Sequence, residues 1–359
     1  MESVKSILLD IDNDCEIVIQ DNSSDNSLGN QMSNLRDYRI KYFHTSTPLS
    51  FIDNFEEGLN NTKGKFFCLL GDDDCTTKDI LEVVNWMDSN SIESVSSNRV
   101  TNFIWPNDDI TQGLLTIPLY NGQKRLVDTN ANLKSFLKNG LVNYQIFDLP
   151  RAYHGIILKS KMDEIKSIAG RYFGGLTPDI YSTIALSCVI KSHYIINFPF
   201  SIAGACPESA TAKAPLGGHA GRIEDAPHLK NRGDYLWEKK VPKYYSVDTI
   251  WAETSIKAIK DLKLDTLLSN INYYKLYVYS YFHNRKFIKE IALDETLKMR
   301  RKLNTAKFIF FFNIMLALLG VFIRRVRYIF RNQVHQHSSF SDVFSLEEAK
   351  LILYKSLNK

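Results

Sequence analysis

The residues of this chain that suggest chemistry are three consecutive aspartates, Asp72, Asp73 and Asp74, which follow the apolar run 65–70 and Gly71. Such a run predicts a buried strand, and open α/β folds bind ligands at the carboxyl edge of their sheets. Adjacent negative charges repel each other unless a positive group joins them. Mg²⁺ and Mn²⁺ take oxygen ligands and often use one or two carboxylates together with substrate phosphates. We therefore expect a divalent cation here, with Asp72 and Asp74 as its ligands.

The same cluster also has a purely structural interpretation. Thr76, Thr77 and Asp79 come just before a helical run, 80–87, and these residue types are preferred as helix N-caps. In that case the carboxylates would only help to begin a helix. We keep this interpretation as the alternative to the metal site.

Length and composition exclude several classes of protein. With 359 residues, 44% hydrophobic and 12% aromatic, the chain is long and apolar enough for a sizeable folded core. Its formal charge of +4 is small, and the basic residues gather near the C-terminus, so we do not expect a nucleic-acid binder. The five cysteines form no CxxC pair, which favours free thiols in a reducing compartment. Without a secretory signal at its start, the chain is expected in the cytoplasm.

The N-terminal third reads as an α/β unit. We predict strands at 16–21 and 40–43, a helix at about 50–61, and a third strand after Gly64. This order implies parallel strands with a right-handed connection, which would bring Asp21 and Asp72 to the same edge. Before the first strand the sequence shows only a helical fragment, 4–9, so the unit is expected to lack the strand with which such folds normally open.

These segments carry a family resemblance. "EIVIQDNSSDNS" followed by "FIDNFEEGLNNTKGKFFCLLGDDD" resembles the nucleotide-sugar half of family 2 glycosyltransferases with the GT-A fold, well over 1–110 and more loosely to about 260. It departs from the family at the start, where no strand with a Pro-Thr-Tyr-Asn type loop is present. The resemblance implies an α/β, GT-A fold with a helical C-terminal extension. The expected divisions are a nucleotide-sugar half (1–110), an acceptor half (111–222), a helical extension (223–300), a hydrophobic and basic helix (301–331) and a tail (332–359).

The resemblance also implies roles for individual residues. Asp21 would hydrogen-bond the uracil of a UDP-sugar, and Asn54 and Asp73 would join the nucleotide-sugar site. Asp72 and Asp74 would hold the ribose, the diphosphate and a Mn²⁺ or Mg²⁺ ion. The bound cation would neutralise the charge that develops on the leaving diphosphate. For Asp21 the alternative is an ordinary turn aspartate.

An inverting transferase also needs a base for the acceptor hydroxyl. Asp179 follows the glycine-containing segment 173–176 at the start of a helical run, and it resembles the acidic residue that opens the acceptor-side helix in the family. The alternative is that Thr177 or Asp179 only caps this helix, with Pro178 in its first turn. A helix N-terminus also lowers a carboxylate pKa, which would weaken the base.

Three further residues are candidates for the acceptor side or a mobile loop. His154 precedes the strand-like run 156–158 and would line the acceptor side, or else be a buried structural histidine. His219 and Arg222 lie in the glycine-rich segment 215–222, which we expect to be able to close over a diphosphate. Arg222 could meet it with two hydrogen bonds.

The C-terminal third predicts helices, including an apolar stripe over 250–262 and a tyrosine-rich run over 273–287. The segment 308–323 is almost wholly apolar, with Lys307 before it and Arg324, Arg325, Arg327 and Arg331 after or near its end. As a helix it would span about 24 Å, less than the roughly 30 Å hydrocarbon core, which favours a helix in the membrane interface over a crossing. A buried core or dimer helix is the alternative. We expect 333–341 to be loose and 346–357 to form a short helix.

Together these patterns predict an inverting glycosyltransferase that uses a nucleotide diphosphate sugar and a polysaccharide or lipid-linked glycan acceptor in cell-surface polysaccharide synthesis. It would act at the inner face of the plasma membrane, where a homo-oligomer is compatible with the sequence. One alternative is a catalytically impaired, membrane-attached partner or scaffold protein. Another is a nucleotidyltransferase, but the basic, glycine-rich phosphate loop that this would require is not visible.

Overall fold

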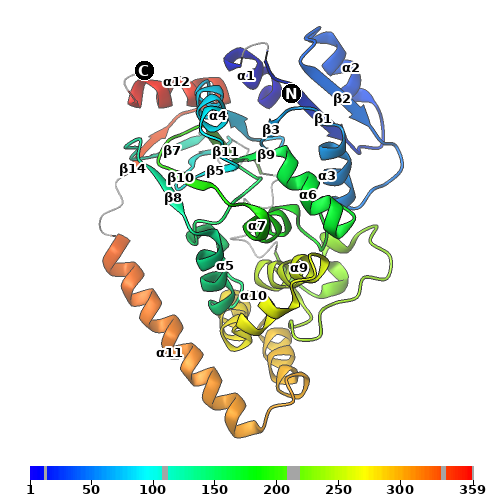
Figure 1. Ribbon diagram of the computed structural model, residues 1–359, viewed down its shortest axis with the longest axis vertical. Coiled ribbons are helices and arrows are strands. Elements are labelled where there is room, and N and C mark those ends of the chain that lie inside the picture. The colour runs from blue at the N-terminus through cyan, green and yellow to red at the C-terminus, as the bar shows by residue number, and fades with distance from the viewer. Residues whose placement is uncertain (12–13, 107–111, 208–218, 333–336, 358–359) are drawn as a thin grey trace.

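The computed structural model describes residues 1–11, 14–106, 112–207, 219–332 and 337–357, and for 327–332 only the backbone. Strands gather in the upper half of the view in Figure 1, and most helices of the second half of the chain lie below them. The protein is a mixed α/β fold with a helical C-terminal part, as the sequence predicted.

The N-terminal unit holds two parallel strands, β1 (Ile17–Asp21) and β2 (Ile40–His44), with Asp21 opposite His44. Helix α1 (Glu2–Asp10) precedes them, α2 (Ser27–Asn34) joins them, and α3 (Phe51–Asn60) follows. The hydroxyl of Ser50 accepts a hydrogen bond from the backbone of Asp53 and so begins α3. The predicted strands, the helix after them and the helical start of the chain are therefore confirmed.

The central sheet has five strands in the order β3-β9-β5-β10-β8, of which only β5 and β10 are parallel neighbours. Their bounds are β3 (Phe66–Phe67), β9 (Gly155–Leu158), β5 (Ser94–Ser97), β10 (His193–Ile196) and β8 (Lys124–Val127). The apolar run before the aspartates is thus a strand of two residues, extended by one bridge between Leu69 and Tyr153. The expectation that this strand joins β1 and β2 in one parallel unit was wrong, because β3 pairs antiparallel with β9 while β1 and β2 form a sheet of their own.

A second five-stranded sheet has the order β14-β7-β6-β11-β4. Its members are β14 (His337–Ser341), β7 (Leu114–Pro118), β6 (Thr101–Ile104), β11 (Ser201–Ala205) and β4 (Cys75–Thr76). The C-terminal strand β14 runs antiparallel to β7 along its whole length. The expectation of a loose segment was therefore wrong for 337–341, whereas 333–336 lies outside the described residues. A separate pair, β12 (Ala220–Gly221) and β13 (Tyr245–Ser246), is antiparallel.

The remaining helices surround two apolar cores. They are α4 (Ile80–Ser89), α5 (Thr129–Lys138), α6 (Lys159–Ala169), α7 (Pro178–Val189), α9 (Val247–Asp261), α10 (Tyr273–Lys302), α11 (Lys307–Asn332) and α12 (Leu346–Ser356), with short 3₁₀ turns at Tyr144–Ile146, Ile223–Asp225, Pro227–Leu229 and Asp265–Asn270. One core lies among α3, α5, α6, α7, α9 and α10. The other lies among the strands, α1, α4 and α12. The aspartate segment passes between them, because Phe67 belongs to the first core and Cys75 to the second.

The C-terminal helix α12 is part of the body. The ammonium group of Lys350 lies 2.6 Å from a carboxylate oxygen of Asp10 and donates a hydrogen bond of 2.6 Å to the carbonyl oxygen of Ser6. The hydroxyl of Tyr354 donates to the same carboxylate. Figure 1 shows α12 beside α1, so the two ends of the described chain close one face of the domain together.

Helix α11 is longer than the apolar run suggested. Its stretch Lys307–Val326, with a mean hydropathy of 2.0, is long and apolar enough to cross a membrane by length and composition. The argument that the segment is too short to cross was therefore wrong, because helical structure continues beyond 308–323 on both sides. In Figure 1 this helix stands apart from the sheets at the lower left.

We predict that Lys350→Ala lowers the free energy of unfolding by about 3 kcal/mol, because it leaves the Asp10 carboxylate without its cation in a largely buried place. The side chain of Lys350 is only 5% exposed. Urea denaturation measures the change, and Lys355→Ala, on the exposed side of the same helix, serves as the control. Equal stability of the two variants would mean that α12 does not support the fold.

Candidate active site

The carboxylate of Asp74 is the most highly connected polar group around the aspartate segment. It is 1% exposed. Its Oδ2 accepts hydrogen bonds of 2.6 Å from both the backbone of Gly71 and the hydroxyl of Tyr153, and its Oδ1 accepts one of 2.7 Å from the backbone of Gly204. Burial alone would raise the Asp74 pKa, but these hydrogen bonds and the contact with His154 outweigh it, so the pKa is lowered. Asp74 is therefore held as an anion.

His154 completes this network from the loop before β9. Its Nε2 lies 3.2 Å from Oδ2 of Asp74, and its Nδ1 lies 3.1 Å from the hydroxyl of Ser201. The backbone of His154 has a φ of +53°, an uncommon conformation that aims the ring at Asp74. Gly204 reaches the same carboxylate because it has no side chain, since a Cβ there would lie 1.9 Å from the carbonyl oxygen of Asp73.

The other two aspartates differ from Asp74 and from each other. Asp72 is exposed, whereas Asp73 is 8% exposed and accepts a hydrogen bond from the backbone of Cys206. Burial and then the neighbouring Asp74 charge raise the Asp73 pKa. Among the described residues no three acidic, histidine or cysteine side chains are arranged to hold a metal ion. Two carboxylates and a diphosphate can hold Mg²⁺ or Mn²⁺. Asp72 is exposed, whereas Asp74 is 1% exposed and its Oδ1 already accepts a hydrogen bond from the backbone of Gly204.

Asp179 lies near this cluster. It is in the first turn of α7, after Pro178, and is partly exposed. The hydroxyl of Tyr144 donates a hydrogen bond of 3.4 Å to it. Burial is the main reason that the pKa of the Tyr153 phenol is raised, and the charge and hydrogen bond of Asp74 and the charge of Asp179 add to it. Burial raises the pKa of Asp179 despite its hydrogen bonds. The expectation that the helix N-terminus would lower this pKa was therefore wrong in its net direction.

The two predicted nucleotide residues of the first unit have different surroundings. Asp21 is 7% exposed, and it accepts hydrogen bonds from the hydroxyl of Tyr42 and the backbone of Ser23. Burial opposes its ionisation, but these bonds outweigh it and lower its pKa. Asn54 is half-buried in α3, and within the described residues its Oδ1 has no hydrogen-bond partner. The side chain of Asn54 thus holds a buried, unpaired acceptor within the described residues.

The two remaining candidates come from the segment around β12. Nδ1 of His219 lies 2.9 Å from the hydroxyl of Tyr245. Arg222 lines a surface hollow of about 300 Å³ together with α10 residues such as Asp294 and Glu295. Half of the glycine-rich segment 215–222, which was expected to close over a diphosphate, lies outside the described residues, namely 215–218.

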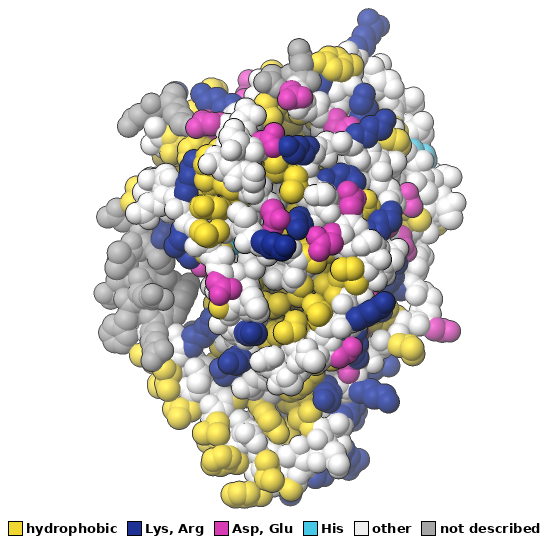
Figure 2. All heavy atoms as spheres, in the orientation of Figure 1, with side chains coloured by type: hydrophobic (Ala, Val, Ile, Leu, Met, Phe, Trp, Pro, Cys, Tyr) yellow, Lys and Arg dark blue, Asp and Glu magenta, His cyan; other side chains and the backbone are white. Residues whose placement is uncertain are grey.

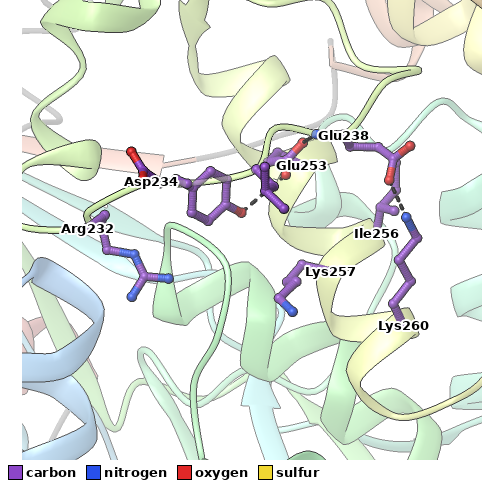
Figure 3. A pocket seen from close by; sticks show the side chains of 9 residues that line it. Arg232, Asp234, Glu238, Glu253, Ile256, Lys257 and Lys260 are labelled. Carbon is purple, nitrogen blue, oxygen red and sulfur yellow. Dashed lines mark hydrogen bonds and ion pairs between the residues drawn. The ribbon is translucent and has the colours of Figure 1, made fainter.

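Sequence reasoning missed Tyr153, Ser201 and Gly204, because each comes from a segment far from Asp74 in the chain. It also missed Glu253, which is 3% exposed on α9. Its carboxylate accepts hydrogen bonds from the hydroxyl of Tyr235 and the backbone of Glu238, at the edge of a hollow of about 400 Å³ shown in Figure 3. Burial raises the Glu253 pKa to about 7. A single glutamate within a helical pattern does not indicate, from the sequence, that its side chain is buried or that its pKa is raised.

We predict that Glu253 makes the protein less stable as the pH rises from about 4.5 to about 7. In this range the folded state keeps a proton that the unfolded chain has lost, so unfolding releases a proton and a higher pH favours it. Glu253→Gln should remove this dependence and raise the free energy of unfolding at pH 8, by an amount on the order of 3 kcal/mol, with little gain at pH 4.5. Urea denaturation at both pH values measures it.

The control for this prediction is Glu290→Gln, on an exposed part of α10. It should leave the pH dependence as in the wild type. An equal gain from Glu253→Gln at both pH values would contradict the assignment.

Comparison with known proteins gives one family match. Residues 1–157 match the family described as "Glycosyl transferase family 2". No curated protein is similar enough to this chain to count as a relative.

Among solved structures, the chain resembles S. aureus TarS 1-349 in complex with UDP-GlcNAc, at 13% identity and a TM-score of 0.44, over 85% of this chain and 88% of that one. It also resembles the same protein in complex with UDP, at 14% identity and a TM-score of 0.42, over the same shares. At these TM-scores the structural similarity adds nothing to the sequence match of residues 1–157.

The matched segment contains β1, β2, α3 and the three aspartates, and it ends within β9 beyond Tyr153 and His154. It therefore covers most of the Asp74 network. Residues 1–157 of this chain are thus similar to family 2 glycosyltransferases, and the similarity includes the aspartate segment.

Proposed function

We propose that this protein transfers a sugar, with inversion, from a nucleotide diphosphate sugar to a polysaccharide or lipid-linked glycan acceptor in cell-surface polysaccharide synthesis. The observation that carries the proposal is the arrangement around Tyr153. The hydroxyl of Tyr153 donates a hydrogen bond to Asp74, and the charge of Asp179 contributes to the raised pKa of its phenol. These two relations support a common region for the aspartate segment and the start of α7. A donor and an acceptor have to meet in such a region.

In this proposal residues 1–110 bind the donor, a UDP-sugar. Asp21, with its lowered pKa, is an acceptor for the imide N–H of uracil. Asn54 offers its unpaired oxygen, and Asp73 stays close to the ribose and diphosphate. An ion pair at the first turn of α3 supports this half, because Arg171 lies 2.6 Å from Asp53 and so joins α3 to the loop before α7.

A divalent cation, Mn²⁺ or Mg²⁺, would be held by Asp72 together with Oδ1 of Asp74 and the donor diphosphate. When bound, it supplies positive charge that stabilises the leaving diphosphate. Asp72 supports this role because it is exposed. The hydrogen bonds from Gly71, Tyr153 and Gly204 fix the orientation of Asp74, which leaves Asp72 as the ligand that is free to move.

Residues 111–222 would form the acceptor half, with Asp179 as the base. A carboxylate whose pKa is raised by burial is better matched to accept a hydroxyl proton near neutral pH than an ordinary aspartate. Tyr144 orients it, and His154 lies on the same side, next to Asp74. His219 and Arg222 would contribute from the loop around β12 once substrate is bound.

The place of action we propose is the inner face of the plasma membrane, where residues 301–331 bring the enzyme to a lipid-linked acceptor. The nine large apolar side chains between Phe308 and Ile323 that are strongly exposed support this location, since soluble surfaces rarely carry such a patch. The helical segment 223–300 would connect this region to the acceptor half.

A catalytically impaired, membrane-attached partner is the second candidate function. One observation favours it: β1 and β2 form a two-stranded sheet that does not continue into the central sheet. A donor site built on β1 and β3 would then be less rigid than one built on adjoining strands. Binding and turnover measured separately distinguish the two candidates.

We predict that calorimetric titration of the full chain with UDP detects binding only when Mn²⁺ is present. Asp72→Asn should weaken this binding by at least about tenfold, since one of the two carboxylates at the cation is neutralised. Asp88→Asn, which changes another exposed aspartate next to Lys65, is the matched control and should bind as the wild type does. Absence of heat from the folded wild type would rule out the donor site.

We predict that Asp179→Asn keeps the dissociation constant for UDP and Mn²⁺ but lowers kcat by roughly 10²- to 10⁴-fold, because the acceptor hydroxyl loses its base. UDP release, measured with the UDP-sugar that binds in calorimetry, reports turnover. Ser182→Ala, one turn further along α7, is the control. Near wild-type turnover in Asp179→Asn would show that another group is the base.

A further inference from the structure

The outer face of α11 is apolar although nothing in the described chain covers it. Phe308, Phe312, Met315, Leu319 and Phe322 repeat at spacings of four and three residues, and they are 55–81% exposed. Figure 2 shows hydrophobic side chains along the lower left of the molecule, where Figure 1 places this helix. In water this stripe would leave a large apolar area unburied.

The inner face of the same helix is attached to the protein. Phe310 is 1% exposed and packs against the rings of Tyr274 and Tyr277 on α10, with centroids 5.8 and 6.4 Å away. One heptad and two heptads further on, Ala317 is buried, and Arg324 donates to the side chain of Asn139 and stacks over Phe147. The helix therefore lies along the domain, and its contacts with the domain are on one side of the helix.

The elements before and after α11 belong to the same body. Before it, the hydroxyl of Tyr277 on α10 donates to the carbonyl of Lys240, and Asn284 donates to the carboxylate of Asp248 on α9. After it, β14 follows from His337 and pairs with β7. The sheet of β7 also contains β4, which directly follows Asp74.

This topology decides how the helix can meet a bilayer. A helix that crosses has its two ends on opposite sides, about 30 Å apart. If α11 crossed, α10 and β14 would lie on opposite sides of the membrane. The sheet containing β14 and the helix α12 that packs on α1 would then have to come apart. The length of Lys307–Val326 permits a crossing, but the pairing of β14 with β7 opposes it.

We propose that α11 is a monotopic anchor: it lies in the interface of one leaflet of an anionic bilayer, with the stripe Phe308–Phe322 facing the acyl chains and both of its ends on the side of the catalytic domain. Charge supports the choice of a lipid surface. Arg301, Lys302, Lys307 and Arg325 are exposed near the two ends of the helix, and within the described residues none of them has an acidic partner. Such cations favour anionic headgroups, whereas they would repel their counterparts in many arrangements of a second copy of the chain.

This inference deepens the proposed location of the enzyme, but it is tested by lipid binding and can fail while the transferase proposal stands. The first experiment is flotation of the purified full chain with vesicles of phosphatidylglycerol and phosphatidylcholine. We expect binding that weakens with salt and is weaker on phosphatidylcholine alone. The double variant Met315→Glu, Leu319→Glu should reduce partitioning by roughly a hundredfold or more, because two apolar contacts with lipid are lost and two like charges are added.

The matched control is Leu9→Glu, since this leucine is 69% exposed on α1, at the opposite end of the molecule in Figure 1. It should float as the wild type does. Circular dichroism and thermal unfolding of all variants establish that they are folded. Failure of the folded wild type to float with either vesicle would overturn the proposal, and so would a stable dimer in solution that the double variant converts to monomer.

The second experiment determines sidedness. Cysteines introduced at exposed positions before and after the helix, Asn304→Cys and Ser338→Cys, are treated with a membrane-impermeant maleimide-polyethylene glycol after the protein has bound to the outside of sealed vesicles. The wild type, with its five native cysteines, gives the background. We expect both added thiols to react as fast as in detergent. If only the cysteine at position 338 failed to react with the maleimide, and detergent made it react, α11 would cross the membrane and the proposal would be overturned.

Discussion

The hydrogen bonds to the buried carboxylate of Asp74 are the interactions on which the rest of this structure depends. Groups from distant segments reach its side chain, among them the hydroxyl of Tyr153 and the backbone of Gly204, while the hydroxyl of Ser3 donates to its carbonyl oxygen. An unpaired anion at 1% exposure would be strongly destabilising, so all of these donors have to be present together. Asp74 thereby connects α1, the loop before β9 and β11 at the place where the two cores meet.

This role changes the chemical meaning of the three aspartates. In sequence they are equivalent, but the fold gives each a different environment: Asp72 is exposed, Asp73 is buried with a raised pKa, and Asp74 is buried with a lowered one. The chain turns at Asp72 and Asp73, where the backbone of Asp74 donates a hydrogen bond to the carbonyl oxygen of Gly71. The three side chains therefore meet different surroundings, and that of Asp73 reaches the backbone of Cys206. Asp72 therefore offers exposed oxygens that can meet a ligand, whereas the oxygens of Asp74 are fixed by hydrogen bonds.

Much of the fold could be predicted where local signals are strong. β1 and β2 follow from short apolar runs that end in turn residues, and α3 from the Ser50 cap and its apolar face. The pairing of β3 with β9 and of β14 with β7 could not be predicted, since the partners lie far apart in the chain and short strands carry little register information. For the site, acidic candidates could be named, but Tyr153 and His154 join Asp74 only through a turn with a φ of +53° at His154.

The sequence by itself determined the similarity of residues 1–157 to a glycosyltransferase family, the acidic segment and the presence of one long apolar helix, because these depend on residue types and spacings along the chain. Tertiary structure alone decided which aspartate is exposed, why burial raises the pKa of Asp179, and that β14 returns to the body after α11. Each of these depends on which distant groups surround a residue. Burial, hydrogen bonding and the sidedness of a helix are properties of that surrounding, and composition and periodicity do not contain it.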